Sequence, residues 1–363
     1  MRAAIGHEWI VTMGGSERVA LEFHELYPDA PIFTTVYDRG RRPEFNAIDV
    51  RPSFLQRLPG ATRRYPRLLP LMPLAFSRFD TRGYDLVLLS SHAASKAMPK
   101  HPGQQHVCYC HTPMRYAWDL YDVYVSGSGL SAPERLAARV IFRAMRRWDR
   151  RSARHIDAFI ANSQNVRGRI RRYYGVDATV IPPPIDCQRF RPAARVSDYF
   201  LVVSRLVPYK RVDLAVRAFS ELGWPLRVVG AGVERTRLEA MAGPNVQFLG
   251  AVDDAALARE YAGARALVFT ANEDAGMVPL EAMASGRPVL AYGQGGATEV
   301  IEPSKTGAFF DRQDPESLIS ALKAFEPGVY DPAVLRAHAE QFDRPRFRAA
   351  IGGFIERLMG ERQ

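Results

Sequence analysis

The sequence contains few cysteines, with only Cys108, Cys110 and Cys187 among 363 residues. Three thiols cannot build a disulfide framework, which excludes a disulfide-stapled secreted scaffold and suits a reducing compartment. No apolar run approaches the ~20 residues that a bilayer-spanning helix needs. Met1-Arg2 leads directly into Ala3–Gly6, which is typical of a strand rather than a signal peptide. We therefore expect a cytoplasmic protein without a transmembrane segment.

The balance of charge is basic, with 49 lysines and arginines against 39 aspartates and glutamates, a formal net charge of +10. Such a bias fits nucleic acid, anionic lipid or phosphorylated ligands, and does not by itself choose among them. Because no nucleic-acid-binding motif with interleaved aromatic residues accompanies it, we expect no nucleic-acid partner. With 47% hydrophobic residues the chain can bury substantial cores, and its length predicts two domains.

Arginines concentrate in two segments of the first half. One is a helix-compatible stretch, Ala137–Ala153, without glycine or proline, and the other is Phe54–Arg82, which mixes leucines with arginines and is broken by prolines. Each segment has two interpretations. It is a solvated face or buried insertion, or it is a basic and apolar surface that holds the protein at the anionic inner face of the plasma membrane. The arginines of the first segment and its continuation are Arg139, Arg143, Arg146, Arg147, Arg150, Arg151, Arg154, Arg167, Arg169, Arg171 and Arg172.

Short apolar runs alternate with longer helical patterns along the chain. This alternation is typical of βαβ units and predicts an α/β protein with a doubly wound parallel sheet in each half. Strands are expected in the first half near Ala3–Gly6, Pro31–Val36, Tyr84–Ser90, His106–Cys110, Asp157–Ala161 and Thr179–Ile181. In the second half they are expected near Phe200–Ser204, Leu226–Val229, Val246–Leu249, Ala266–Thr270, Pro288–Ala291 and Ala308–Phe310. Helices between these later strands are expected at Arg211–Leu222, Val233–Met241, Asp253–Ala262, Val278–Ser285 and Pro315–Phe325.

Pro182-Pro183-Pro184 marks the break between the two halves, because a run of prolines continues neither a strand ladder nor a helix. With a hinge at Pro182–Pro192, we predict an N-terminal domain over residues 1–184 and a C-terminal domain over residues 185–344. The last stretch, residues 345–363, has a helical pattern and is expected to pack back on the first domain.

In open parallel sheets, ligands bind beyond the carboxyl ends of the strands, and two such loops in the first half carry candidate residues. Gly14-Gly15 follows the opening strand and allows close approach of the backbone to a ligand, although the pair also suits a plain tight turn. His111 stands at a strand end after Cys108 and Cys110, where it is a candidate polar or catalytic contact. No second ligand cluster accompanies this Cys-x-Cys-His, so we expect core cysteines and no metal.

Arg205 and Lys210 lie five residues apart on the loop after the first strand of the second half. A guanidinium binds a pyrophosphate bidentately and an ammonium adds a point charge, so the pair suits a diphosphate. If a bond to that diphosphate were cleaved, the two cations would stabilise the charge left on it without a metal. Surface charges on a loop would explain either residue alone, but explain the pair less well.

The loop after the strand near Ala266–Thr270 carries the strongest pattern. Gly276 opens a tight turn, and Pro279 is expected to begin a helix whose free backbone N–H groups can hold an anion. Glu273 lies on the loop and Glu281 about one turn into the helix. We expect the two carboxylates to flank a diphosphate, one accepting from sugar hydroxyls and the other from ribose hydroxyls.

Over nearly the whole chain, these residues resemble the motifs of the retaining GT-B glycosyltransferases of family GT4. Glu273 and Glu281 match the family's E-x7-E motif, and Arg205 and Lys210 match its donor-phosphate pair. The resemblance implies two Rossmann-like domains facing a central cleft, the first on the acceptor side and the second binding the donor, with no metal or cofactor. It also implies that the cleft histidine and the first glutamate contact the donor hexose, and that the second glutamate binds the ribose. The other site residues it implies are Gly14 and Gly15 of the first loop, His111 as that histidine, and Gly276, Met277 and Val278, whose amides hold phosphate and sugar.

Three stretches, GGSERV, HTPMRYAWD and VPYKRVDLAV, look most like the WbaZ-type GDP-mannose-dependent mannosyltransferases. This similarity implies GDP-mannose as donor and a lipid-linked or oligosaccharide acceptor in O-antigen or exopolysaccharide biosynthesis. Asp274-Ala275 departs from the aromatic or acidic-aromatic pair common in the family, which leaves another donor, such as a UDP-sugar, open. The remaining alternatives are a sugar-nucleotide epimerase and a non-catalytic binder of polyanions.

Overall fold

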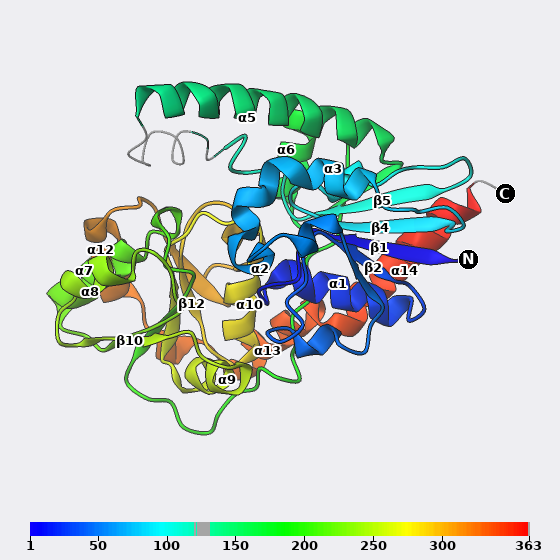
Figure 1. Cartoon of the computed structure of the whole chain (residues 1–363). Helices are drawn as coiled ribbons and strands as arrows, with labels where there is room; N and C mark the ends of the chain where they lie inside the picture. The colour runs from blue at the N-terminus through cyan, green and yellow to red at the C-terminus, as the bar shows by residue number, and fades with distance from the viewer. Residues whose placement is uncertain (120, 122–130, 362–363) are drawn as a thin grey trace. The chain divides into compact units, whose positions relative to one another are not determined.

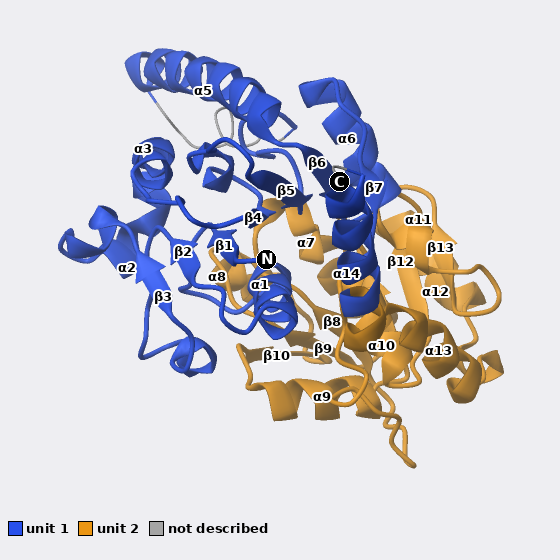
Figure 2. Cartoon of the chain, turned by 90° about the vertical axis from the view of Figure 1, so that its right-hand side faces the viewer, with its two compact units in different colours: residues 1–182, 348–363 blue, residues 183–347 orange. Residues whose placement is uncertain are grey.

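The computed structural model describes residues 1–119, 121 and 131–361. The chain divides into two compact units (Figure 2). Unit 1 contains Met1–Pro182 and Arg348–Gln363, and unit 2 contains Pro183–Phe347. Each unit has its own all-parallel sheet flanked by helices, which confirms the predicted fold class of two doubly wound α/β domains. No helix in the described ranges is both long and apolar enough to span a bilayer.

Unit 1 is built on a parallel sheet with the strand order β3-β2-β1-β4-β5-β6-β7 (Figure 1). Its central strands β1, β4 and β5 are buried along their whole lengths, as expected for strands covered on both faces. The strand order reverses between β1 and β4, which is the point at which such sheets place ligands. The strands are β1 (Ala3–His7), β2 (Ile32–Thr34), β3 (Val50–Pro52), β4 (Leu86–Ser91), β5 (Gln105–Cys110), β6 (Ala158–Ala161) and β7 (Thr179–Val180).

Helices cover both faces of this sheet. Cys108 and Cys110 point toward the core beneath α3, α5 and α6, and both are buried free thiols, which confirms them as core residues. On the opposite face, Phe23 of α1 packs edge-on against Tyr109. The helices are α1 (Gly15–Leu26), α2 (Ala61–Arg64), α3 (Met72–Ser77), α5 (Ala132–Ser152) and α6 (Gln164–Tyr174), with short 3₁₀ helices η1 (Pro43–Phe45), η2 (Phe54–Arg57), η3 (Tyr65–Leu71), η4 (Ser95–Ala97) and η5 (Ala153–His155).

The C-terminal helix α14 (Arg344–Gly360) belongs to unit 1 from Arg348 onward. Nη1 of Arg348 donates to Oε2 of Glu22 at 2.6 Å, and Glu22 is a buried residue of α1. This contact joins the chain's last helix to its first, and Figure 2 shows the two side by side.

Unit 2 is built on a parallel sheet with the order β10-β9-β8-β11-β12-β13, which reverses between β8 and β11. Its strands alternate between two cores. In β11, Leu267 and Phe269 pack into one cluster, and Ala266 and Val268 into the other. The strands are β8 (Phe200–Val203), β9 (Leu226–Val229), β10 (Val246–Gly250), β11 (Ala266–Phe269), β12 (Val289–Tyr292) and β13 (Gly307–Phe310). The helices are η6 (Pro208–Lys210), α7 (Val212–Leu222), α8 (Arg235–Ala240), α9 (Asp254–Gly263), α10 (Met277–Ala284), α11 (Ala297–Val300), α12 (Pro315–Ala324), η7 (Pro327–Val329), α13 (Pro332–Ala339) and η8 (Glu340–Phe342).

The two arginine-rich segments of the first half form a long helix and a half-buried run of short helices. Helix α5 begins five residues before the predicted Ala137, because the carboxylate of Glu134 accepts from the backbone N–H and the hydroxyl of Ser131 and so caps the first turn. Pro133 fits there since the N–H groups of a first turn have no helical partner. The segment Phe54–Arg82 is half buried: Met72 and Phe76 enter the core, while its arginines stay exposed.

Candidate active site

In unit 1, a single hydroxyl joins the candidate His111 to His7 at the carboxyl ends of β1, β4 and β5. Oγ of Ser90 lies 2.8 Å from Nε2 of His111 and 3.1 Å from Nδ1 of His7. The same hydroxyl donates its proton to the backbone carbonyl of Ser16 at 3.2 Å. When that proton points to the carbonyl of Ser16, both imidazoles donate to Ser90. In this arrangement each ring takes one tautomer, and Nδ1 is the acceptor nitrogen of His111.

The protein holds His111 neutral. Burial, with contributions from His92 and His7, keeps the pKa of His111 well below its ordinary value of 6.5. The pKa of His7 is also lowered, chiefly by burial. A neutral histidine at this position can accept a hydrogen bond from a hydroxyl group, but cannot supply a positive charge to a phosphate.

Glu8, which sequence reasoning missed, shapes the loop beside His111. Its buried carboxylate accepts from the backbone N–H groups of Ala93 at 2.9 Å, Ala94 at 2.8 Å and Ser95 at 3.1 Å. Desolvation raises the pKa of Glu8, but His92, Lys96 and these N–H groups outweigh it, so that the pKa of this carboxyl is lowered. The anion thus fixes the turn after β4 that carries His92, whose ring centroid lies 6.1 Å from that of His111.

Gly14 and Gly15 stand where β1 leads into α1. Gly14 is the N-cap residue in an extended conformation, and Gly15 is the first residue of the helix. A Cβ on Gly14 would lie 3.1 Å from Oε2 of Glu17, a tight approach. Ser16 lies inside the helix, and its hydroxyl donates to Glu17 at 2.9 Å.

We expect unit 1 to lose stability as the pH falls below 6.5. Three histidines have lowered pKa values, chiefly through loss of contact with water: the buried His7 and His106, the latter at about 4, and the partly buried His111. Between the folded and unfolded pKa values the unfolded chain binds more protons, so the free energy of unfolding falls by about 1.4 kcal/mol per pH unit for each histidine. Urea unfolding between pH 7 and pH 5 should show this slope, and His106→Gln should reduce it by about a third. A free energy of unfolding that stays constant over this range would contradict the expectation.

In unit 2, a lysine and a glutamate from two neighbouring loops form an ion pair. Nζ of Lys210, at the end of η6, pairs with Oε1 of Glu273 on the loop after β11. Both side chains are largely buried, at 13% and 17% exposure. The hydroxyl of Thr270 donates to the carbonyl of Lys210 at 3.0 Å and ties the two loops together. The pair lies where β8 and β11 end, at the reversal of strand order.

Tyr209 connects the two candidate cations. Nη2 of Arg205 donates to the hydroxyl of Tyr209 at 2.6 Å, and Nζ of Lys210 lies 5.3 Å from the centroid of the same ring. Arg205 is exposed on its loop. The two cations thus flank one aromatic side chain, so they can act on the same anion.

Helix α10 starts next to this ion pair. It begins at Met277, one residue before the predicted range Val278–Ser285 and two before Pro279, because Gly276 is its N-cap and proline is tolerated in a first turn. The N–H groups of Met277 and Val278 belong to that first turn, where backbone donors have no helical partner. A Cβ on Gly276 would lie 2.2 Å from Cγ2 of Val300, so the close approach of α11 requires glycine.

Two further features of unit 2 were missed in the sequence. Gly295 has a positive φ of 71°, and a Cβ there would lie 2.6 Å from the carbonyl of Glu273. The neighbouring Gly296 donates its N–H to that carbonyl at 2.8 Å, so a hydrogen bond from the loop after β12 fixes the backbone of Glu273.

The second feature is the partner of Glu281 in α10. Oε2 of Glu281 accepts from the buried hydroxyl of Tyr261 at 2.9 Å. Burial, together with the charge of Glu281, raises the pKa of Tyr261 well above 10.

The candidate residues therefore gather at the strand-order reversal of each sheet. No group of three or more histidine, cysteine, aspartate or glutamate side chains is placed to hold a metal ion in the described ranges. The candidate residues of unit 2 are two cations, two carboxylates and a helix N-terminus: Arg205, Lys210, Glu273, Glu281 and Gly276–Val278. This set suits a ligand that carries both a phosphate group and hydroxyl groups.

Comparisons with known proteins agree with this arrangement. The model described as Glycosyltransferase Family 4 matches residues 13–189, and that described as Glycosyl transferases group 1 matches residues 188–330. The chain is 30% identical to a D-inositol 3-phosphate glycosyltransferase of Geodermatophilus obscurus over 46% of this chain and 45% of that one. It is 29% identical to a GDP-mannose-dependent alpha-mannosyltransferase of Mycolicibacterium smegmatis over 81% of this chain and 77% of that one.

Several of the curated relatives are matched over about half of their length. The crystal structure of Anabaena HepE in complex with UDP-glucose superposes with a TM-score of 0.73 and 18% identity, over 98% of this chain and 100% of that one. That likeness shows a shared fold of two Rossmann-like sheets. Together the two family models cover residues 13–330, and the chain belongs to the family 4, group 1 glycosyltransferases.

Proposed function

We propose that this protein transfers a hexose from a nucleotide-sugar donor to a hydroxyl of a lipid-linked or oligosaccharide acceptor, with retention of configuration at the anomeric carbon. The observation that carries the proposal is the Lys210–Glu273 ion pair beside the N-terminus of α10. It supplies a cation for a diphosphate and a carboxylate for hexose hydroxyls within one pair of loops. Family membership supports the same reaction class.

In the proposed reaction, the bond between the anomeric carbon and the diphosphate oxygen breaks while the acceptor oxygen bonds to the same face of that carbon. The acceptor proton passes to the leaving phosphate oxygen, so the products are a glycoside and a nucleoside diphosphate. Arg205, Lys210 and the N–H groups of Met277 and Val278 stabilise the negative charge on that leaving group. The charge stabilisation comes from fixed protein groups and needs no metal ion.

We assign the other residues to sugar and ribose contacts. Glu273 accepts from hexose hydroxyls, and Glu281, held by Tyr261, accepts from the ribose. In unit 1, His111 accepts from a hexose hydroxyl through Nδ1, while the Gly14-Gly15 turn lets backbone approach the ligand. Unit 2 is thus the donor domain and unit 1 the acceptor domain.

We propose GDP-mannose as the donor. The support is the similarity to a GDP-mannose-dependent alpha-mannosyltransferase over 77% of that protein. A UDP-sugar is the alternative donor. Its support is the fold that this chain shares with a protein solved in complex with UDP-glucose, so the experiment below also includes UDP-glucose.

Donor-specific thermal stabilisation in EDTA tests the proposal. A ligand present at about 100 times its dissociation constant stabilises the folded state by about 2.7 kcal/mol. We expect GDP-mannose to raise the melting temperature by several degrees in EDTA, and UDP-glucose to raise it less. Product analysis with acceptor then distinguishes transfer from epimerisation, since an epimerase would isomerise the donor without acceptor. Failure of every nucleotide-sugar to stabilise the protein would refute the donor site.

A further inference from the structure

Helix α5 presents a stripe of apolar and cationic side chains to solvent. Residues spaced four, three, four and four apart lie on one face of a helix, and Leu136, Val140, Arg143, Arg147 and Arg151 follow this spacing. Leu136 and Val140 are 61% and 62% exposed, which is unusual for large aliphatic side chains. The stripe is thus apolar near the start of the helix and cationic along the rest.

The buried residues of α5 are Met145, Asp149 and Ser152, and all three lie in its C-terminal half. Oδ1 of Asp149 pairs with Nζ of Lys96 at 3.1 Å, and both side chains are fully buried. Oδ2 of Asp149 accepts from Nε1 of Trp118 and from the hydroxyl of Tyr174, both at 2.9 Å. Residues 132–137 are all exposed, so the first part of the helix extends past the core of unit 1 (Figure 1).

Helix α5 carries much more positive than negative charge. The helix has seven arginines and two acidic residues, which gives it a net charge of about +5. One acid, Asp149, is buried against Lys96, and the other, Glu134, accepts from Ser131 at the first turn. In the part of the chain that the structure describes, no ion pair joins Arg143, Arg147 or any other arginine of the stripe to a carboxylate. These arginines therefore carry their charge outward.

A second basic and apolar element lies beside α5. Residues 53–79 contain five arginines and no acidic residue, and they include η2, α2, η3 and α3. Leu71 and Leu74, at the end of η3 and within α3, are both nearly half exposed. Their exposed side chains and the neighbouring arginines repeat the composition of the stripe on α5.

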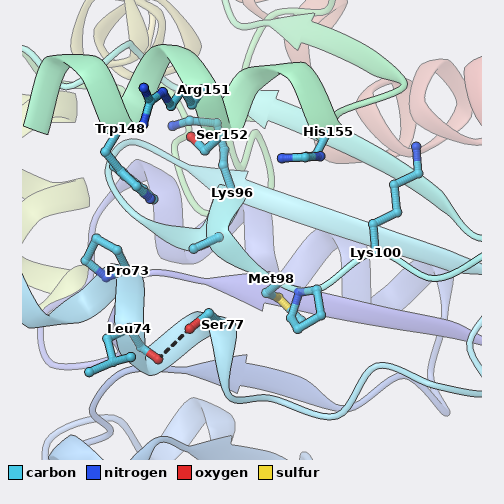
Figure 3. Close-up of a pocket in the computed structure, with 12 residues that line it drawn as sticks. Pro73, Leu74, Ser77, Lys96, Met98, Lys100, Trp148, Arg151, Ser152 and His155 are labelled. Carbon is cyan, nitrogen blue, oxygen red and sulfur yellow. Dashed lines mark hydrogen bonds between the residues drawn. The ribbon is translucent and has the colours of Figure 1, made fainter.

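A groove of about 680 Å³ joins the two elements. Trp148 and Arg151 of α5 line one side, and Pro73 and Leu74 of α3 line the other, with Met98 between them (Figure 3). Lys100, which pairs with Asp157 at 2.6 Å, and His155 also line it. Arg151 belongs both to the groove and to the stripe, which makes the two one continuous surface.

We propose that the stripe of α5, the exposed residues of η3 and α3, and the groove between them form a docking surface for the headgroup layer of an anionic phospholipid bilayer. Arginines attract anionic headgroups, and Leu136, Val140, Leu71 and Leu74 enter the boundary between headgroups and acyl chains. The exposed aliphatic side chains favour a lipid partner over nucleic acid, because the phosphates of a nucleic acid would contact only the arginines. The proposal does not depend on the sugar-transfer reaction.

Flotation of the full chain with vesicles tests this surface directly, without donor or acceptor. We expect binding to phosphatidylcholine vesicles with about 30% phosphatidylglycerol, and at least tenfold weaker binding to phosphatidylcholine alone. Arg143→Glu/Arg147→Glu and, separately, Leu136→Ser/Val140→Ser should each weaken binding to the anionic vesicles at least tenfold. Arg217→Glu/Lys323→Glu, on exposed positions of α7 and α12, makes the same change in net charge and should bind like the unmodified protein.

Circular dichroism melting shows whether each variant remains folded, and the α5 positions chosen are exposed, so folding should survive. The proposal is overturned if both α5 double variants bind like the unmodified protein, or if the unit 2 control loses as much binding. Equal binding to neutral and anionic vesicles would also overturn it. Stronger retention of the protein by duplex DNA than by anionic vesicles would replace lipid with nucleic acid as the occupant.

Discussion

Replacing Lys210 with alanine is expected to lower kcat/KM for sugar transfer by about 10³-fold, because it removes a fixed cation from the leaving diphosphate. The structure places Nζ of Lys210 in an ion pair with Glu273 at the N-terminus of α10, where few other groups can take over its charge. The fold should survive, because Glu273 keeps some contact with solvent and stays hydrated when its partner is removed. Steady-state kinetics with a radiolabelled donor, together with thermal melting, measures both effects.

Lys305→Ala is the matched control for this variant. Lys305 also lies in unit 2 and also pairs with a glutamate, since its Nζ is 2.7 Å from Glu302, but its side chain is 57% exposed. We expect this control to retain full activity. Full activity of Lys210→Ala as well would remove Lys210 from the site.

Replacing Glu273 with glutamine is expected to lower kcat by about 10²-fold while the KM for the donor changes much less. The substitution keeps the size of the side chain and the backbone contact with Gly296 but removes the charge. A carboxylate beside the hexose stabilises the positive charge that develops at the anomeric carbon as its bond to phosphate breaks, and an amide does so less well. Initial rates over a range of donor concentrations separate kcat from KM.

Glu239→Gln provides the comparison, since Glu239 pairs with Arg235 at 2.8 Å on the exposed surface of α8. Its rates should match those of the unmodified protein. If instead Glu273→Gln raised KM and left kcat unchanged, Glu273 would be a binding residue only. The double variant Lys210→Ala/Glu273→Gln should lose less than the product of the single losses, because the two side chains interact.

The fold was largely predictable because its signals are local. Runs such as Phe200–Val203 and Ala266–Phe269 are wholly apolar and bounded by loops, as strands buried on both faces must be. The strand β3 was missed because Arg51 and Pro52 are exposed at the sheet edge and give it no apolar pattern. Helix α5 was predicted too short because Pro133 was not recognised as a first-turn residue.

The candidate site was predictable only where its residues follow a strand directly. Lys210 and Glu273 could be named from their loops, but their ion pair joins positions 63 residues apart and has no sequence signal. Glu8 binds the backbone of residues more than 80 positions later, and Ser90 reaches His7 over a similar separation. Such partners depend on which strands become neighbours, so only the sheet order β1-β4-β5 reveals them.

The Ser90 hydroxyl has a consequence for the kind of ligand that His111 can hold. When its single proton points to the carbonyl of Ser16, the imidazole of His111 gives its own proton to Ser90 and keeps only a lone pair for a group that approaches Nδ1. A hydrogen-bond donor, such as a sugar hydroxyl, can then bind to Nδ1. A carbonyl, an ether oxygen or a fluorine in the same position finds no donor, so the polarity of this contact itself selects among otherwise similar molecules.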